Sequence, residues 1–274
     1  MINLSNWLPV IWGGTIAGGS TGLLGVYIIG MRIPFLGVCV AHAALAGAVF
    51  GALLGLSGQM LMLPALAGAV GTALLLGTLD PQNVRMDTNV MLGLLFSLTM
   101  GLAFLGIGLF AVYGISDNDV RNLLWGSVTL CRWRDALLMT GAAVVELLFV
   151  AAFYKEMRAI MFSRLHAAAA GVRVTFVWTG FLILTSAVLT VNFQTVGGLM
   201  IYSLMTNPAA AAFQLVKGHG RALVLSVVLG GVSGLGGFLI SLAANLPTGA
   251  MIVIFSSLLV ALAAIISRVS RGHT

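Results

Sequence analysis

The chain has 274 residues, of which 60% are hydrophobic and only 7% are charged. A typical soluble domain carries about 25% charged residues, so this chain cannot cover a globule of its size with ionised side chains. The composition excludes a soluble enzyme, a disordered tail and a disulfide scaffold, and it leaves a polytopic membrane protein. The net charge of +6 comes without Lys or Arg interleaved among stacking aromatic residues, so it does not indicate nucleic-acid binding.

The long apolar runs predict an all-α integral membrane protein, a polytopic helical bundle of about eight or nine transmembrane helices. A helix needs about 20 apolar residues to cross the hydrocarbon core, and a barrel of short alternating strands does not fit such continuous runs. The N-terminus lacks Lys and Arg, so the first run is expected to be a retained span and not a cleaved signal peptide. The expected spans are about 7–29, 35–56, 60–78, 90–114, 136–153, 174–192, 195–216, 222–243 and 249–267.

The basic residues predict the orientation of these spans. Three groups fall on one side, which the positive-inside rule makes cytoplasmic: Lys155, Arg158, Arg164 and Arg173; Lys217 and Arg221; Arg268 and Arg271. Counting back through nine spans places Arg32 and Arg85 inside as well. Arg121, Arg132 and Arg134 then lie outside, against the rule and offset by Asp117, Asp119 and Asp135, and this conflict leaves the count at eight or nine.

Small residues recur at helical spacing, which is typical of close contact between membrane helices. The groups are Gly14, Gly18 and Gly22; Gly47, Gly51 and Gly55; Gly230 and Gly234. Tight packing within one subunit is the favoured interpretation, and a dimer face or a hinge is the alternative.

The connection at 154–173 favours a short amphipathic cytoplasmic helix. Its apolar residues fall close to one helical stripe, with Arg158, Arg164 and His166 elsewhere and Gly171 as the C-terminal stop. The pattern fits equally a helix on the membrane surface and one in the groove of a partner. The stripe consists of Ile160, Met161, Leu165, Ala168 and Ala169.

Within the run at 195–216, Asn207 precedes Pro208. Proline removes a helix hydrogen bond, so a break is expected at Pro208. Broken helices at membrane depth occur where they are buried in protein or line a cavity, so this break points to a gated translocation path. Asn207 then either offers its oxygen or freed carbonyls to an ion or caps the broken helix.

Three stretches resemble the membrane subunits of ABC importers for zinc, manganese and iron. One is a glycine-rich first helix followed by a motif similar to the family's Ser-His-Ala-x-Leu-x-Gly. The others are the 154–173 connection, similar to the family's coupling helix, and a Val-Gly stretch that ends in Pro-Ala-Ala-x-Ala. The residues are Gly22 to Gly25 with Ala41 to Gly47, Ala167 to Gly171, and Val196 to Gly198 with Pro208 to Ala212; Leu246 to Ala250 agrees too.

The resemblance implies a single transmembrane permease domain over 1–274, with a coupling helix within about 155–171, that forms the pathway for a divalent metal ion. It implies a multi-pass protein of the bacterial cytoplasmic (inner) membrane that works as a homodimer. Its partners would be a cytosolic ABC ATPase and a periplasmic or lipoprotein solute-binding protein. The residues expected to contact the ATPase are Arg158, Phe162, Ser163, Arg164, Leu165, His166 and Gly171.

The chain has no P-loop, so ATP and Mg²⁺ would be bound by the separate ATPase. It is therefore expected to be a permease with no enzyme activity or bound cofactor of its own, and the metal is its substrate.

The sequence departs from the family pattern at two places. The family places Asp four residues before the motif His, where this chain has Val38. The family's coupling helix opens with Phe-Asp-Pro-Glu, where this chain has Phe162, Ser163, Arg164 and Leu165. The first departure leaves the metal open, and the second alters the surface that docks the ATPase.

His42 and Cys39 are the candidate metal ligands of the pathway. His42 lies about 8 residues, or roughly 12 Å, into its expected span, and an ionisable residue at this depth is a functional candidate. Cys39 precedes it by three residues, so the two side chains can share a helix face. A thiolate and an imidazole favour Zn²⁺ over Mn²⁺. The alternatives are a histidine hydrogen-bonded inside the bundle and a cysteine that packs as a small apolar residue.

Glu146 is the charged residue left deep in a span, with no Lys or Arg in the neighbouring apolar runs. It is either protonated and hydrogen-bonded, or it faces a wet cation pathway. An ion-coupled secondary transporter that uses Glu146 and His42 as relay groups is therefore the main rival. A permease for another small solute and a passive assembly subunit also stay open. An intramembrane hydrolase is disfavoured because the chain has no His-Glu-x-x-His motif.

Overall fold

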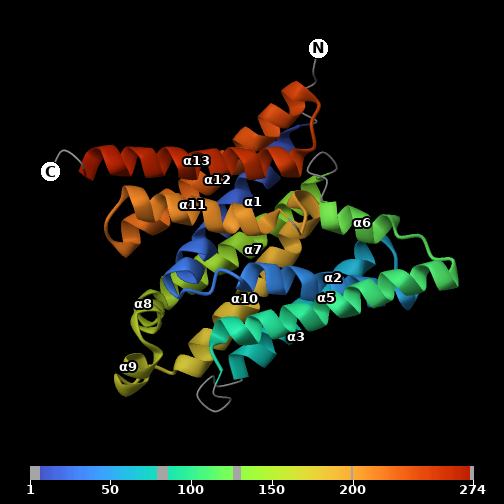
Figure 1. Ribbon diagram of the computed structural model, residues 1–274, viewed down its shortest axis with the longest axis horizontal. Coiled ribbons are helices and arrows are strands. Elements are labelled where there is room, and N and C mark those ends of the chain that lie inside the picture. The colour runs from blue at the N-terminus through green and yellow to red at the C-terminus, as the bar shows by residue number, and fades with distance from the viewer. Residues whose placement is uncertain (1–6, 79–85, 126–130, 199, 272–274) are drawn as a thin grey trace. The chain divides into compact units, whose positions relative to one another are not determined.

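A computed structural model describes residues 7–78, 86–125, 131–198 and 200–271 (Figure 1). The described residues form helices and contain no strand. In chain order these helices are α1 (Leu8–Gly30), α2 (Leu36–Leu53), η2 (Gly58–Leu61), α3 (Met62–Thr78), α5 (Thr88–Tyr113), α6 (Asn118–Trp125), α7 (Trp133–Ala152), α8 (Tyr154–Phe162), α9 (Arg164–Ala169), α10 (Val174–Val196), α11 (Ile201–Leu215), α12 (His219–Ala244) and α13 (Thr248–Arg271).

The nine expected spans each fall on one of these helices, which confirms the helical polytopic fold. Within the described residues, seven helices are long and apolar enough to cross a membrane: α2, η2 with α3, α5, α7, α10, α12 and α13. The 23-residue α1 is also long enough, since it rises about 34 Å. The 15-residue α11 rises only about 22 Å, less than the roughly 30 Å of a hydrocarbon core.

The chain divides into two compact units. The first contains Met1–Gly30, Trp125–Ala143 and Asn192–Thr274, and the second contains Met31–Leu124 and Val144–Val191. Helices α7 and α10 each contribute residues to both units. The first unit therefore holds α1, α11, α12 and α13, and the second holds α2, α3, α5, α6, α8 and α9.

In the first unit, α1 and α12 lie side by side because glycines let their backbones meet (Figure 1). A Cβ at Gly18 would overlap the carbonyl oxygen of Gly230, and a Cβ at Gly230 would overlap that of Gly18. The Ser226 hydroxyl adds a 2.6 Å hydrogen bond to the Gly22 carbonyl. These glycines of the small-residue pattern thus pack helices within one subunit, as the favoured interpretation expected.

The expected helix break at Pro208 is wrong, because α11 continues through this residue. Proline has no N–H and deprives the Leu204 carbonyl of its helix donor. The Thr21 hydroxyl of α1 lies 3.5 Å from that oxygen, but it donates its one hydrogen over a shorter distance, 2.6 Å, to the Ala17 carbonyl. The chain instead breaks at Gly197, whose φ of 90° glycine adopts readily, and α10 extends to Val196, past its expected end.

In the second unit, α2 packs between α3 and α5. Gly47 of α2 meets the Pro64 backbone of α3, and Gly68 of α3 meets the Ala43 backbone of α2. On the other side of α2, Val49 fills the space over Gly106 of α5. The helix that carries His42 is therefore held by backbone contact on one side and by side-chain contact on the other.

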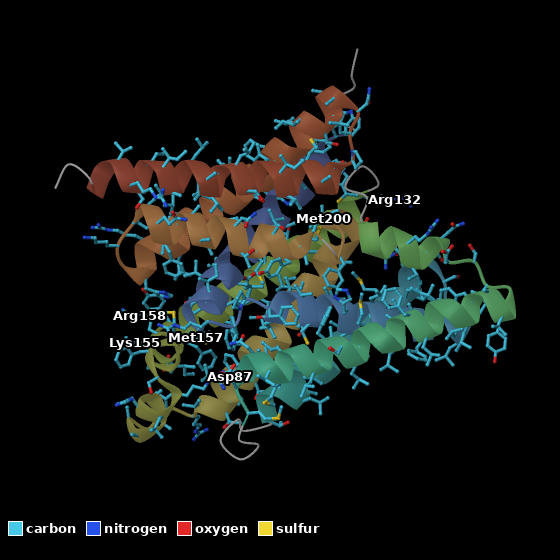
Figure 2. The ribbon with its side chains drawn as sticks, in the orientation of Figure 1. Asp87, Arg132, Lys155, Met157, Arg158 and Met200 are labelled. Atoms are coloured by element: carbon cyan, nitrogen blue, oxygen red, sulfur yellow. The ribbon has the colours of Figure 1, made fainter. Side chains whose placement is uncertain are left out.

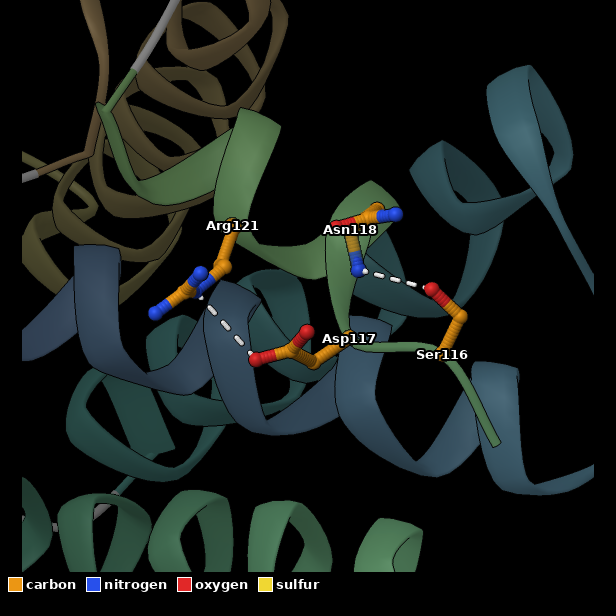
Figure 3. Close-up of polar contacts among 4 residues, drawn as sticks. All are labelled: Ser116, Asp117, Asn118 and Arg121. Atoms are coloured by element: carbon orange, nitrogen blue, oxygen red, sulfur yellow. Dashed lines mark hydrogen bonds and ion pairs between the residues drawn. The ribbon is translucent and has the colours of Figure 1, made fainter. Parts of the chain in front are cut away.

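The acidic residues near α6 have local partners, and Asp117 pairs with one of the basic residues there. Arg121 Nε lies 3.2 Å from Asp117 Oδ2, and Asn118 N–H donates to Ser116 Oγ at 3.4 Å (Figure 3). Asp119 accepts the Gly58 N–H at 2.8 Å, which ties α6 to η2. Of the other residues used for orientation, Arg85 lies outside the described part of the chain.

The glycine contact between α1 and α12 predicts a position-specific effect on stability. Gly18→Ala should lower the thermal stability of the detergent-purified protein by about 2 kcal/mol, because backbone atoms of Gly230 cannot yield to a new Cβ. Gly101→Ala in α5 is the matched control, since no atom lies within 4 Å of its added Cβ. This control should be neutral or should stabilise by about 0.5–1 kcal/mol. Equal losses from both variants would contradict the packing argument.

Candidate functional site

His42 lies on α2, six residues or roughly 9 Å after the first residue of that helix. Its Nδ1 lies 2.9 Å from the Val38 carbonyl oxygen. A carbonyl only accepts hydrogen bonds, so Nδ1 carries the proton and a neutral ring has its lone pair on Nε2. This hydrogen bond from one ring nitrogen is the arrangement that orients a metal-ligating histidine.

The imidazole of His42 is also oriented by an aromatic ring. Its centroid lies 4.8 Å from that of Phe96 on α5, with the rings at 79°. The His42 side chain is 8% exposed, so the ring is mostly enclosed in the second unit. No sequence signal marks Phe96, because an aromatic residue on an apolar helix is indistinguishable from ordinary packing.

Cys39 lies one turn before His42 on the same helix and is fully buried. Val38, where the resemblance would place a carboxylate, instead contributes its backbone oxygen to His42. The residues that the structure describes contain no group of three or more His, Cys, Asp or Glu side chains able to hold a metal ion. One copy of this part of the chain therefore offers an open ligand set and no closed cage.

The other cysteine, Cys131, does not join these residues. It lies in the first unit, where its Sγ donates to the Pro9 carbonyl at 3.5 Å. Burial, with the negative charge of Asp135, raises the pKa of the Cys131 thiol to about 11. The thiol therefore stays protonated near neutral pH and is a poor metal ligand.

Glu146 is buried in α7, with 1% of its surface exposed. Neither carboxyl oxygen has a hydrogen-bond partner among the described residues. The hydrogen-bonded alternative for this residue is thus not observed. An unpartnered carboxyl group at membrane depth is expensive, which keeps Glu146 a functional candidate.

One alternative expected Asn207 to cap a broken helix, and the structure does not show this role. Its Nδ2 donates to Ser256 Oγ and Ser257 Oγ of α13, both at 3.0 Å. Asn207 and Pro208 belong to the first unit, whereas Cys39, His42 and Glu146 belong to the second. The amide of Asn207 therefore serves a contact between α11 and α13.

The segment at 154–173 is two helices, so the single apolar stripe is wrong. Ser163 is extended, with φ −165° and ψ 121°, and it separates α8 from α9. On α8, Met157 and Ile160 are buried, whereas Lys155 and Arg158 are exposed (Figure 2). After this break Leu165 is 66% exposed and no longer continues the buried stripe.

Ser163 caps α9 in the position where the family motif has Asp. Its hydroxyl accepts the backbone N–H of His166 at 3.3 Å and lies 2.9 Å from Nδ1 of that residue. Serine and aspartate are both good N-cap residues, so the departure preserves the start of the helix. Phe162 is 86% exposed beside this cap, and it forms an apolar tip with Leu165.

The end of α9 follows the prediction for Gly171. Its φ is 84°, and its N–H donates to the Ala168 carbonyl while that of Val172 donates to the Ala167 carbonyl. This pair of hydrogen bonds is a Schellman motif, which requires a residue in the left-handed region. Gly171 thus stops α9 and turns the chain toward α10.

Arg164 joins α9 to α10 through an aromatic contact. Its guanidinium carbon lies 3.7 Å from the centre of the Trp178 ring, and Trp178 is 4% exposed. Arg158 makes a looser contact of 5.7 Å with Tyr154 on its own helix. Sequence reasoning missed Trp178, because a tryptophan at the start of a span is common at membrane interfaces.

Comparison with known proteins identifies the family of this chain. The sequence pattern of the ABC 3 transport family matches residues 3–267. A manganese transport system membrane protein, MntC of Listeria monocytogenes, is 27% identical over 87% of this chain and 82% of its own length. A zinc transport system membrane protein, TroC of Treponema pallidum, is 29% identical over 89% and 83%.

The fold is also similar to a solved structure. PsaBC from Streptococcus pneumoniae, determined in complex with a Fab, superposes with a TM-score of 0.80 and 22% identity, covering 94% of this chain and 90% of that one. This likeness agrees with the helical polytopic arrangement. The family match covers nearly the whole sequence, and the chain belongs to the ABC 3 transport family.

Proposed function

We propose that this chain forms the translocation pathway for a divalent metal ion in an ATP-binding-cassette importer of the bacterial inner membrane. The observation that carries the proposal is His42, an imidazole at membrane depth whose Nδ1 is engaged by Val38 and whose Nε2 is the remaining ring nitrogen. Relatives named for manganese and zinc transport support the substrate class.

The ion passes His42 with few protein ligands. A transport site must release its ion, so an open set suits a conduit better than a closed cage of four ligands. The imidazole of His42 favours Zn²⁺, because Val38 supplies no carboxylate for a harder ion such as Mn²⁺. Phe96 keeps the ring in one orientation as the ion passes.

The energy comes from a separate cytosolic ATPase that binds ATP and Mg²⁺. The exposed residues Phe162, Leu165 and His166 around the start of α9 provide its docking surface. A second copy of this chain completes the pathway, and an external solute-binding protein delivers the ion. Both units of the chain act as one permease domain.

An ion-coupled secondary carrier is the second candidate, and Glu146 is the observation that favours it. A buried carboxyl group that no described residue hydrogen-bonds can act as a proton relay. Under the main proposal, uptake into proteoliposomes that contain the chain and its ATPase requires ATP and survives a protonophore. Uptake without ATP that collapses with the protonophore would favour the carrier.

The His42 pathway predicts a loss of metal uptake. His42→Ala should lower cellular uptake of the limiting metal at least about ten-fold, because even indirect loss of ligand support costs 10–100-fold in metal affinity. Elemental analysis of cells that express the chain with its ATPase and solute-binding protein measures the effect.

The control for this variant is Thr99→Val, which removes a buried hydroxyl from α5 that bonds only within its own helix. Its uptake should stay within about two-fold of wild type, as for a neutral local hydrogen-bond change. Unchanged uptake in His42→Ala, at equal protein levels in the membrane, would refute the role of His42.

The N-cap of α9 predicts a second effect, on coupling. Ser163→Ala should weaken the cap by about 1 kcal/mol and speed amide hydrogen exchange in α9 about five-fold. ATP-dependent uptake should fall with it, because the docking helix frays.

Ser163→Asp provides the matched rescue, because Asp is an equally good cap. Both the exchange rate and the uptake of this variant should equal those of wild type. If Ser163→Ala speeds exchange and leaves uptake unchanged, α9 does not transmit the action of the ATPase.

A further inference from the structure

A cavity of about 650 Å³ lies in the second unit, beside the docking helix α9. Its walls come from the connection between α1 and α2, the end of α3, the start of α5, the facing sides of α8 and α9, and the start of α10. All of these residues belong to the second unit, and none of them is a candidate ligand of the metal pathway.

Two arginines line this cavity, Arg32 and Arg164. The guanidinium group of Arg164 lies over the Trp178 ring. Arg32 has no carboxylate partner within the described part of the chain. Its backbone is held in the left-handed region, with φ 59°, and its carbonyl accepts a 3.1 Å hydrogen bond from Asn89 Nδ2. Such a conformation is uncommon for arginine, and the contact with α5 maintains it at this cavity.

One acidic side chain, Asp87, also lines the cavity. Its Oδ1 accepts the Asn89 N–H at 2.8 Å as the N-cap of α5 (Figure 2 labels Asp87). The carboxylate therefore stabilises the positive end of that helix. Two guanidinium groups and one engaged carboxylate leave the lining net positive.

The rest of the lining is largely apolar, and it includes Ile33, Ile160, Val174 and Trp178. The cavity thus combines positive groups with an apolar wall, which suits an amphiphile better than a small soluble anion.

The ends of the helices give the level of this cavity in the membrane. Helices α2, α5 and α10 begin at it and α3 ends at it. These ends share one membrane boundary with the basic segment α8–α9, the side that the positive-inside rule makes cytoplasmic. Basic pockets between transmembrane helices at this level bind the headgroups of anionic lipids.

We propose that this cavity binds the phosphate headgroup of an anionic phospholipid from the cytoplasmic leaflet. Arg32 and Arg164 contact the phosphate, and an acyl chain lies against the apolar wall. The lipid bridges α9 and the start of α5. This lipid site does not depend on which ion is transported. A negative result for lipid binding therefore leaves the proposed metal pathway standing, and a negative result for metal uptake leaves the lipid site standing.

The test titrates the full-length chain in detergent with phosphatidylglycerol, and with phosphatidylcholine of the same acyl chains, by native mass spectrometry. Arg32→Asn removes the guanidinium and keeps a residue that tolerates the left-handed backbone. It should weaken phosphatidylglycerol binding about five-fold and leave phosphatidylcholine unchanged, as should Arg164→Gln. Arg158→Gln is the matched control on α8, outside the cavity, and it should change neither lipid.

Asp87→Asn should change lipid binding in the opposite direction. A misfolded variant would not bind the lipid more tightly. Asparagine retains the N-cap and removes the charge that repels phosphate, so binding of phosphatidylglycerol should tighten several-fold. If Arg158→Gln weakens lipid binding as much as Arg32→Asn, the binding depends on the overall positive charge of the surface, and the specific site is refuted. Displacement of the lipid by inorganic phosphate would assign the cavity to a soluble anion and refute the lipid.

Discussion

The hydrocarbon interior of a membrane supplies no hydrogen-bonding partner, so each backbone group that enters it must be paired within the protein. This constraint explains the helical fold and also its irregularities. Pro208 removes one N–H inside α11, and the released carbonyl of Leu204 lies near the Thr21 hydroxyl of α1. At Gly197, where α10 ends, the Gly197 N–H still donates to the Phe193 carbonyl at 2.9 Å. The chain thus turns at Gly197 while this backbone donor stays paired.

Because lipid tails are as apolar as leucine, contact between these helices depends on small residues and a few polar bonds. Gly18 and Gly230 allow backbones to touch, and Asn207 donates to two serines of α13. A polar residue in a span is thus often structural. A functional role is indicated when one of its polar atoms makes no hydrogen bond that holds the helices together. His42 meets this criterion through Nε2, which has no hydrogen bond within the described part of the chain, and Asn207 does so less well because its amide already joins two helices.

The helices themselves could be predicted from the sequence, because long apolar runs leave no other fold for 274 residues. His42, Ser163 and Gly171 could be selected because their residue types perform distinctive tasks on a helix or at its ends. The sequence pattern predicted the wrong position for the helix end where two helix-breaking residues lie close together. Pro208 is a strong breaker, yet the φ of 90° at Gly197 ends the helix instead. Phe96 and Trp178 carry no pattern of their own, since their roles exist only through His42 and Arg164 across the fold.

The departure at Ser163 and Arg164 changes how the docking helix is anchored. Serine retains the cap that aspartate would supply, so α9 still starts at the same residue. Arginine, in place of proline, exchanges a fixed backbone angle for a guanidinium that stacks on buried Trp178. A cation–π contact with one desolvated face is worth about 2 kcal/mol, comparable to the cap itself. The first turn of α9 is thereby joined to the first turns of α10, which links α9 to a transmembrane helix through a side chain as well as through the backbone at Gly171.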